Sequence, residues 1–76
     1  MATKNPRNEK VIKQFGINVR KFRELKGLKM VELAVLCEVE YGTISTIERG
    51  LVNCTISTAH SVAKALEVTM DQLFED

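Results

Sequence analysis

Two short apolar-patterned segments, separated by about three residues, constrain the fold of this chain more than any other feature. They read MVELAVLC at residues 30–37 and YGTISTIERG at residues 41–50. Helical spacing predicts that their inward residues are Leu33, Ala34, Cys37, Ile44 and Ile47. So short a connection leaves no slack, and two helices joined by it must cross at a steep angle. The two segments therefore predict a helix-turn-helix unit.

The residues on either side of this unit also follow helical spacing. A first helix is expected from Glu9 to Lys26, with Gly27 in the position where a left-handed helix end favours glycine. Its apolar stripe consists of Val11, Phe15, Val19 and Phe22. A fourth helix is expected to follow a Thr55 cap and to run to about Glu67. Its inward residues are predicted to be Ile56, Ala59, Val62, Ala63 and Leu66.

The last apolar segment runs from Met70 to Phe74, has Thr69 as its cap, and is expected to form a fifth helix. No stretch alternates apolar and polar residues for long enough to form a sheet, so we predict an all-α fold of five helices around one core. The 76 residues fit a single small domain. Residues 1–8, MATKNPRN, lack apolar periodicity and are expected to form a flexible basic arm, which places the domain at residues 9–76.

Charge is divided unevenly along the chain, although the net charge is only +1. Residues 1–29 hold nine Lys or Arg against two acids, a balance of +7. Residues 30–76 hold two Lys or Arg against eight acids, a balance of −6. The basic amino-terminal part suits a polyanion, so charge favours a nucleic-acid partner.

Side chains for metal or enzyme chemistry are scarce. The two cysteines, Cys37 and Cys54, and the single histidine, His60, are too few for a four-ligand metal site. His60 has no evident nucleophile and orienting carboxylate around it, and the four glycines stand too far apart for a phosphate-binding loop. No apolar run approaches the length of a membrane span. We therefore expect no enzyme, cofactor, metal, membrane partner or small-molecule substrate.

The redox state of the two thiols depends on the compartment. Because no signal peptide is evident, we expect a cytoplasmic protein with reduced Cys37 and Cys54. The spacing by itself leaves a disulfide between them open. Reduced, both thiols would act as small apolar side chains.

Three stretches carry a resemblance to a known family. They are FGINVRKFRELKGL, ELAVLCEVEYGTISTIERG and ISTAHSVAKALEVTMDQLF, and together they cover about residues 15–74. In order and spacing they resemble the Xre/Cro-type helix-turn-helix family, relatives of lambdoid phage repressors and of restriction-modification controller proteins. The resemblance implies a five-helix lambda repressor-like DNA-binding domain. It further implies a transcription regulator that binds a palindromic operator on double-stranded DNA as a homodimer, with the third helix in the major groove.

Site residues follow from the resemblance by position. The residues expected to read bases are Tyr41, Gly42, Thr43, Ser45 and Thr46. Short hydroxyl and methyl groups suit this role because the major groove offers hydrogen-bonding edges and the thymine methyl at close range. The residues expected at phosphates are Lys13, Arg20, Lys21, Lys26, Lys29 and Arg49. A structural ion pair is expected between Arg23 and Glu48, and a dimer interface at Met70, Leu73 and Phe74.

Some positions depart from the family pattern. Lys29 and Met30 stand where Ser or Thr followed by Gln is common, and Glu40 stands where Ser is common. An apolar set lies on the expected outer side of the second helix and in the following loop: Val31, Val35, Leu36, Leu51 and Val52. It is either scattered surface, partly covered by Val11 and Ile12 of the amino-terminal extension, or a site for another protein or for a second protomer. The alternative function is therefore a protein-interaction module, antitoxin-like or coactivator-like, with weak or no DNA readout.

Overall fold

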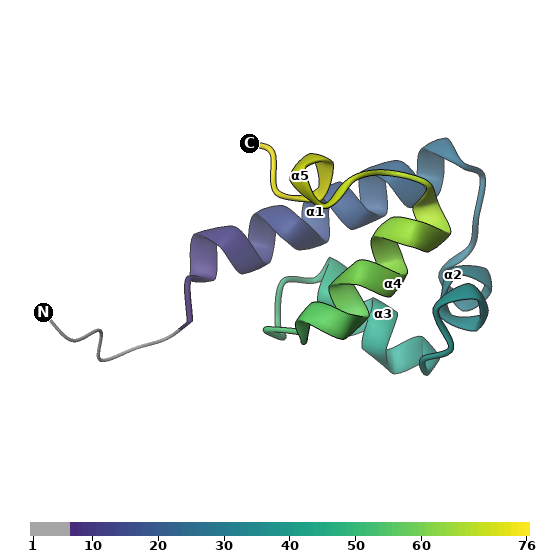
Figure 1. Ribbon diagram of the computed structural model, residues 1–76. Helices are drawn as coiled ribbons and strands as arrows, with labels where there is room; N and C mark the ends of the chain where they lie inside the picture. Colours follow the sequence, from purple (N-terminus) through teal and green to yellow (C-terminus); the bar gives the residue numbers. More distant parts are fainter. Residues whose placement is uncertain (1–6) are drawn as a thin grey trace, which may run out of the picture.

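The computed structural model describes residues 7–76 and confirms the all-α fold, with five helices in that part of the chain. The helices are α1 (Glu9–Leu25), α2 (Met30–Cys37), α3 (Tyr41–Glu48), α4 (Ile56–Leu66) and α5 (Met70–Leu73) (Figure 1). All five begin where the sequence predicts; α2 also ends where predicted, and the other carboxyl-terminal ends differ from the predicted ones by one or two residues. The expected arm lies mostly outside the described residues, apart from Arg7 and Asn8.

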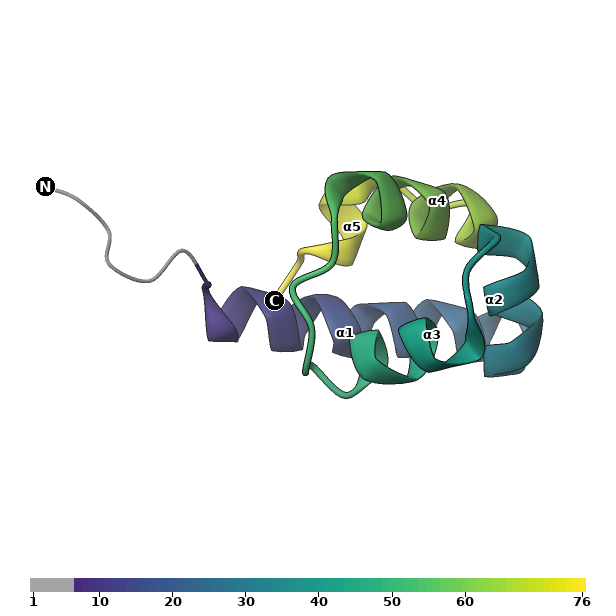
Figure 2. The ribbon, with the colours of Figure 1, turned by 90° about the horizontal axis from the view of Figure 1, so that it is seen from below.

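The helices form two layers that α2 closes at one end. α1 and α3 lie side by side in one layer, while α4 and α5 form the other (Figure 2). The layers enclose a single cluster of buried side chains: Phe15, Val19, Leu33, Ala34, Cys37, Ile44, Ile47, Ala59, Val62, Ala63, Leu66 and Leu73. Every helix contributes to this cluster, so the orientation of α3 depends on the whole core.

Helix ends are fixed by local hydrogen bonds. The Asn8 side chain accepts from the Val11 amide at the start of α1, and the Thr55 hydroxyl accepts from the Thr58 amide at the start of α4. At the start of α2, the Glu32 carboxylate accepts from the Lys29 amide at 2.7 Å. The Lys29 ammonium has no acceptor and takes no part in this cap.

α1 and α3 approach each other at Gly16. A Cβ atom on Gly16 would lie 2.2 Å from the Ile47 carbonyl oxygen and 3.1 Å from that of Glu48. Such distances mean that the backbone of α3 occupies the space where any other residue of α1 would carry a side chain. Gly16 therefore sets how closely the two helices pack.

The structure corrects two of the predicted inward positions. Val11 is 42% exposed, and its neighbour Ile12 is buried in its place. Ile56 is 82% exposed. It is the first residue of α4, directly after the Thr55 cap. At both helix starts, neighbouring elements rather than periodicity decide which side chain is covered.

A buried asparagine holds α5 against α1. Asn18 is the only buried polar residue in the described part of the chain, and its Nδ2 donates to the carbonyl oxygens of Leu73 at 2.9 Å and Glu75 at 2.7 Å. These carbonyls lie at or just beyond the end of α5, where no intrahelical donor reaches them. This role of Asn18 was not predicted, although a polar residue directly before the stripe residue Val19 is a visible signal.

Candidate nucleic-acid interface

α3 presents one outward strip that is uncharged until Arg49 at its carboxyl-terminal end. Ile44 and Ile47 are buried, so the opposite side of the helix carries Gly42, Ser45, Thr46 and Arg49 at spacings of three, one and three. Gly42 and Arg49 are exposed, and the two hydroxyl residues are half-buried. Three of the five residues predicted to read bases thus share this strip.

The remaining two predicted base-reading residues flank the strip. Tyr41 is exposed and Thr43 is half-buried, each toward one side of the helix. Glu40 precedes α3 as its exposed N-cap residue, and its side chain makes no capping hydrogen bond. Its carboxylate therefore stands at the positive end of the helix dipole without a backbone partner.

The hydroxyl group of Thr46 is turned toward its own helix. Its Oγ1 donates to the Gly42 carbonyl at 2.9 Å and to the Thr43 carbonyl at 3.1 Å. One turn earlier, Gly42 has open space: apart from its two chain neighbours and the backbone of its own helix, no atom of the described residues lies within 4 Å of where its Cβ would be. The outward strip therefore has a gap beside Thr46.

The predicted phosphate-binding residues are dispersed. Lys13 packs against Gly50, directly after Arg49, so these two basic side chains lie near the end of α3. Lys29 is exposed before α2.

The other three predicted phosphate-binding residues already have partners within the protein. Arg20 Nε pairs with Glu24 at 3.3 Å, Lys21 Nζ lies over the Phe22 ring, and Lys26 pairs with Glu67, which lowers the Glu67 pKa.

Arg23 and Glu48 join α1 to the end of α3. Arg23 Nε donates to one Glu48 oxygen at 2.6 Å, and its Nη2 donates to the other at 3.1 Å. The Arg23 Nη1 donates to the Leu28 carbonyl at 2.7 Å, in the turn that leads to α2. The hydrogen bond that Arg23 donates to Glu48 raises the pKa of Arg23, although burial opposes this. One guanidinium thus connects α1, α3 and the turn between α1 and α2.

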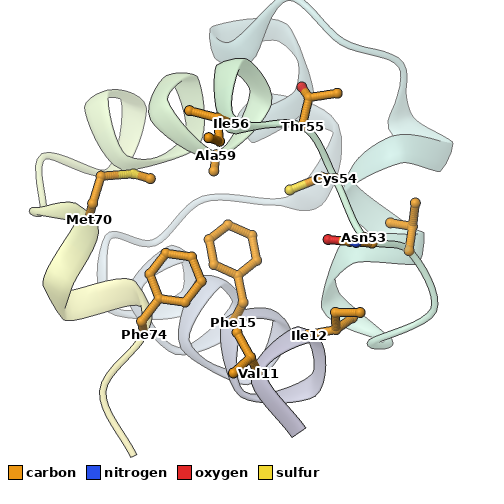
Figure 3. A pocket seen from close by; sticks show the side chains of 11 residues that line it. Val11, Ile12, Phe15, Asn53, Cys54, Thr55, Ile56, Ala59, Met70 and Phe74 are labelled. Atoms are coloured by element: carbon orange, nitrogen blue, oxygen red, sulfur yellow. The ribbon is translucent and has the colours of Figure 1, made fainter. Parts of the chain in front are cut away.

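A second surface lies away from the outward strip of α3. An apolar cavity of about 180 Å³ opens between the start of α1, the loop after α3, α4 and α5. Phe15, Cys54 and Met70 point into it from three different elements (Figure 3). The Phe74 ring packs on Phe15 with 5.0 Å between centroids. We call the rim side chains Val11, Val52, Ile56 and Phe74 the rim set, and all four are exposed.

The three residues of the predicted dimer contact differ in exposure. Met70 lines the cavity and Phe74 is exposed at its rim, but Leu73 has no exposed surface. Leu73 faces the core because α5 is held on α1 by Asn18.

The two thiols are free. Cys37 is buried and Cys54 is half-buried beside the cavity, and burial raises the pKa of both. Within residues 7–76, no three His, Cys, Asp or Glu side chains gather where they could hold a metal ion. In the same residues, no helix has the length and apolar character needed to cross a membrane.

α2 and α3 form a helix-turn-helix, and its second helix carries the outward strip. This arrangement is typical of one class of protein, the helix-turn-helix DNA-binding domains. The chain belongs to the HTH_3 helix-turn-helix family, whose model matches residues 19–73. This confirms the resemblance to Xre/Cro-type transcription regulators, a family of DNA-binding proteins rather than enzymes. A sequence search of curated proteins gave no match.

Solved structures agree with this assignment. The restriction-modification controller protein C.AhdI from Aeromonas hydrophila is 30% identical, with a TM-score of 0.80 over 83% of this chain and 96% of that one. The clp gene regulator ClgR from Corynebacterium glutamicum is also 30% identical, with a TM-score of 0.80 over 83% of this chain and 67% of that one. The hypothetical transcription factor NHTF from Neisseria is 29% identical, with a TM-score of 0.82 over 99% of this chain and 87% of that one.

Proposed function

We propose that this DNA-binding regulator recognises a palindromic operator as a homodimer and inserts α3 into the major groove. The observation that carries the proposal is the outward strip of α3. Its side chains are short and uncharged over the first two turns, and no described helix covers it. Such a strip allows close approach to base edges. Residues 9–76 would act as one domain.

Base reading and phosphate binding are assigned to different side chains. Tyr41, Gly42, Thr43, Ser45 and Thr46 are proposed to face the bases. Lys13, Lys29 and Arg49 are proposed as the main phosphate contacts, because none of them forms an ion pair within residues 7–76. Arg20, Lys21 and Lys26 would contribute less, since each already has a partner in the protein.

The homodimer is proposed to form through the cavity and its rim set. A two-fold interface pairs one surface patch with itself, so it requires both a projecting group and a recess in the same patch. Ile56 projects beside an apolar cavity of about 180 Å³, which is large enough to receive a side chain of that kind. A two-fold axis near this patch would let the Ile56 of each protomer cover the cavity of the other.

Replacing Ile56 with glutamate should therefore weaken the dimer by roughly tenfold or more, because an apolar contact is lost and a charge is placed against an apolar surface. The fold should survive, since Ile56 is exposed and an acid is favourable in the first turn of a helix. Sedimentation velocity measures the change. Val35→Glu, on the exposed side of α2, is the matched control and should leave the dimer intact. An unaltered Ile56→Glu dimer would refute this interface.

The function is tested by selecting binding sites from a random duplex pool at two salt concentrations. We expect an enriched palindrome with half-sites about one helical turn apart. Affinity should fall roughly tenfold or more as salt rises, because phosphate contacts release counterions. If folded, dimeric protein enriches no sequence, DNA reading by α3 is refuted.

That outcome would favour the protein-interaction alternative. α2 supports it with three exposed apolar side chains, Val31, Val35 and Leu36. Replacing both Val35 and Leu36 with lysine would then abolish the complex between this protein and its candidate partner, which sedimentation measures. In a DNA-reading protein the same change should leave operator affinity unaltered.

A further inference from the structure

The outward strip of α3 offers few groups for two-point recognition of a base. Two-point contacts to guanine or adenine in the major groove use Arg, Lys, Asn or Gln. The strip contains only one of these, Arg49, and it stands after the last helical residue. Its central residues, Gly42, Ser45 and Thr46, offer hydroxyl and methyl groups alone. Readout by the centre of α3 must therefore use single hydrogen bonds or apolar contact.

At Thr46 the hydroxyl proton is already used. The bonds to the Gly42 and Thr43 carbonyls hold Oγ1 against the preceding turn. A hydroxyl has one proton, so Thr46 has none left to donate to a guanine, adenine or thymine acceptor. What the side chain still offers to a base is its methyl group, together with an acceptor oxygen drawn back toward the helix.

Gly42 leaves this methyl group accessible. Residues four apart on a helix are neighbours, so a longer side chain at position 42 would cover Thr46. Here the space around Gly42 is open. A base edge can therefore come close to Thr46, and an apolar group on that edge would make the best match.

We infer that Thr46, exposed by Gly42, reads the C5 methyl group of a thymine in each operator half-site. Thymine is the only standard base with an apolar group in the major groove. The inference rests on the proposed function, because it needs α3 in that groove. It adds which chemical group is recognised and by which residue.

The test uses the duplex enriched by selection and replaces each half-site thymine in turn by deoxyuridine, which lacks only the methyl group. At one position the wild-type protein should lose affinity about fourfold per half-site, the value expected for one buried methyl group. Substitution in both half-sites of a dimer should multiply the loss to about fifteenfold. Fluorescence anisotropy at fixed salt measures both.

Two variants separate the methyl group from the hydroxyl group. Thr46→Ser keeps the hydroxyl and should bind the thymine and deoxyuridine duplexes equally, with the affinity that the wild type has for deoxyuridine. Thr46→Val keeps a methyl group and should retain the fourfold difference. Thermal unfolding of both variants checks that α3 is intact. A cytosine pair compared with a 5-methylcytosine pair at the same position shows whether the methyl group alone is enough.

Failure of the inference differs from failure of the function. A thymine-to-deoxyuridine ratio near one at every half-site position, or a ratio unchanged by Thr46→Ser, would overturn the inference while operator binding persists. A loss of discrimination in Thr46→Val but not in Thr46→Ser would assign the contact to the hydroxyl and also overturn it. No enriched duplex would overturn the proposed function, and the inference with it.

Discussion

Replacing Gly16 with alanine should lower the free energy of unfolding by about 3 kcal/mol. The new Cβ would lie 2.2 Å from the Ile47 carbonyl oxygen, well inside contact distance, so α1 and α3 must separate. The neighbour is backbone within a helix and has no rotamer that would relieve the contact. For a chain of this size, whose total stability is roughly 4–11 kcal/mol, the melting temperature should fall by roughly 12–24 °C.

Gly42→Ala is the matched control, because it adds the same methyl group to another helical glycine. No atom beyond the local backbone lies within 4 Å of that position, so the variant should be as stable as the wild type or up to about 1 kcal/mol more stable. Urea unfolding followed by circular dichroism compares the two. If Gly16→Ala unfolds at the same urea concentration as Gly42→Ala, the close approach of α1 and α3 is not a constraint.

Replacing Glu48 with glutamine should cost about 3 kcal/mol or more of stability. The side chains of Arg23 and Glu48 are only 11% and 6% exposed, so removing the carboxylate charge leaves a guanidinium with little water to solvate it. Operator affinity should fall as well, because this pair fixes the end of α3 relative to α1. The pair involves both Glu48 oxygens, and an amide can accept through only one of its two terminal atoms.

The chain contains a matched exposed pair for comparison. The side chains of Arg20 and Glu24 are 65% and 57% exposed, so Glu24→Gln should change stability by no more than about 0.5 kcal/mol. A double variant, Arg23→Met with Glu48→Leu, should recover most of the stability lost in Glu48→Gln, because no unpaired charge remains. Equal urea midpoints for Glu48→Gln and Glu24→Gln would show that the buried pair does not stabilise the domain.

Both predictions concern the position of α3 on the rest of the domain. Its outward strip can read DNA only if the helix is held at a fixed distance and angle from α1. Gly16 sets the distance between α1 and α3 by close contact, and the Arg23–Glu48 pair holds the carboxyl-terminal end of α3. Neither residue belongs to the outward strip, yet each decides where the strip lies.

Much of the fold was predictable because its signals are local. Apolar spacing of three and four residues placed all five helices, and Thr55 and Thr69 cap α4 and α5 as expected. The glycines at the ends of α1 and α3, Gly27 and Gly50, have φ values of 73° and 71°. Glu38 and Glu67 take the same left-handed conformation at the ends of α2 and α4, which nothing in their residue type announces.

The candidate site was only partly predictable. Position in the family motif selected the residues of α3, and the buried Ile44 and Ile47 leave Gly42, Ser45 and Thr46 on the outside. The sequence did not give the bonds of the Thr46 hydroxyl, although they decide which of its groups meets DNA. Nor did it give the ion pair between Lys26 and Glu67, which are far apart in the chain.

By itself, then, the sequence determined the number, order and inward faces of the helices, since these depend on residues three or four positions apart. The tertiary structure alone decided which end positions are covered, as the exposed Ile56, the buried Ile12 and the buried Leu73 demonstrate. It also decided which charges are already paired and where a cavity opens. These properties depend on which elements, distant in the chain, come into contact in space. Helical periodicity carries no information about such contacts.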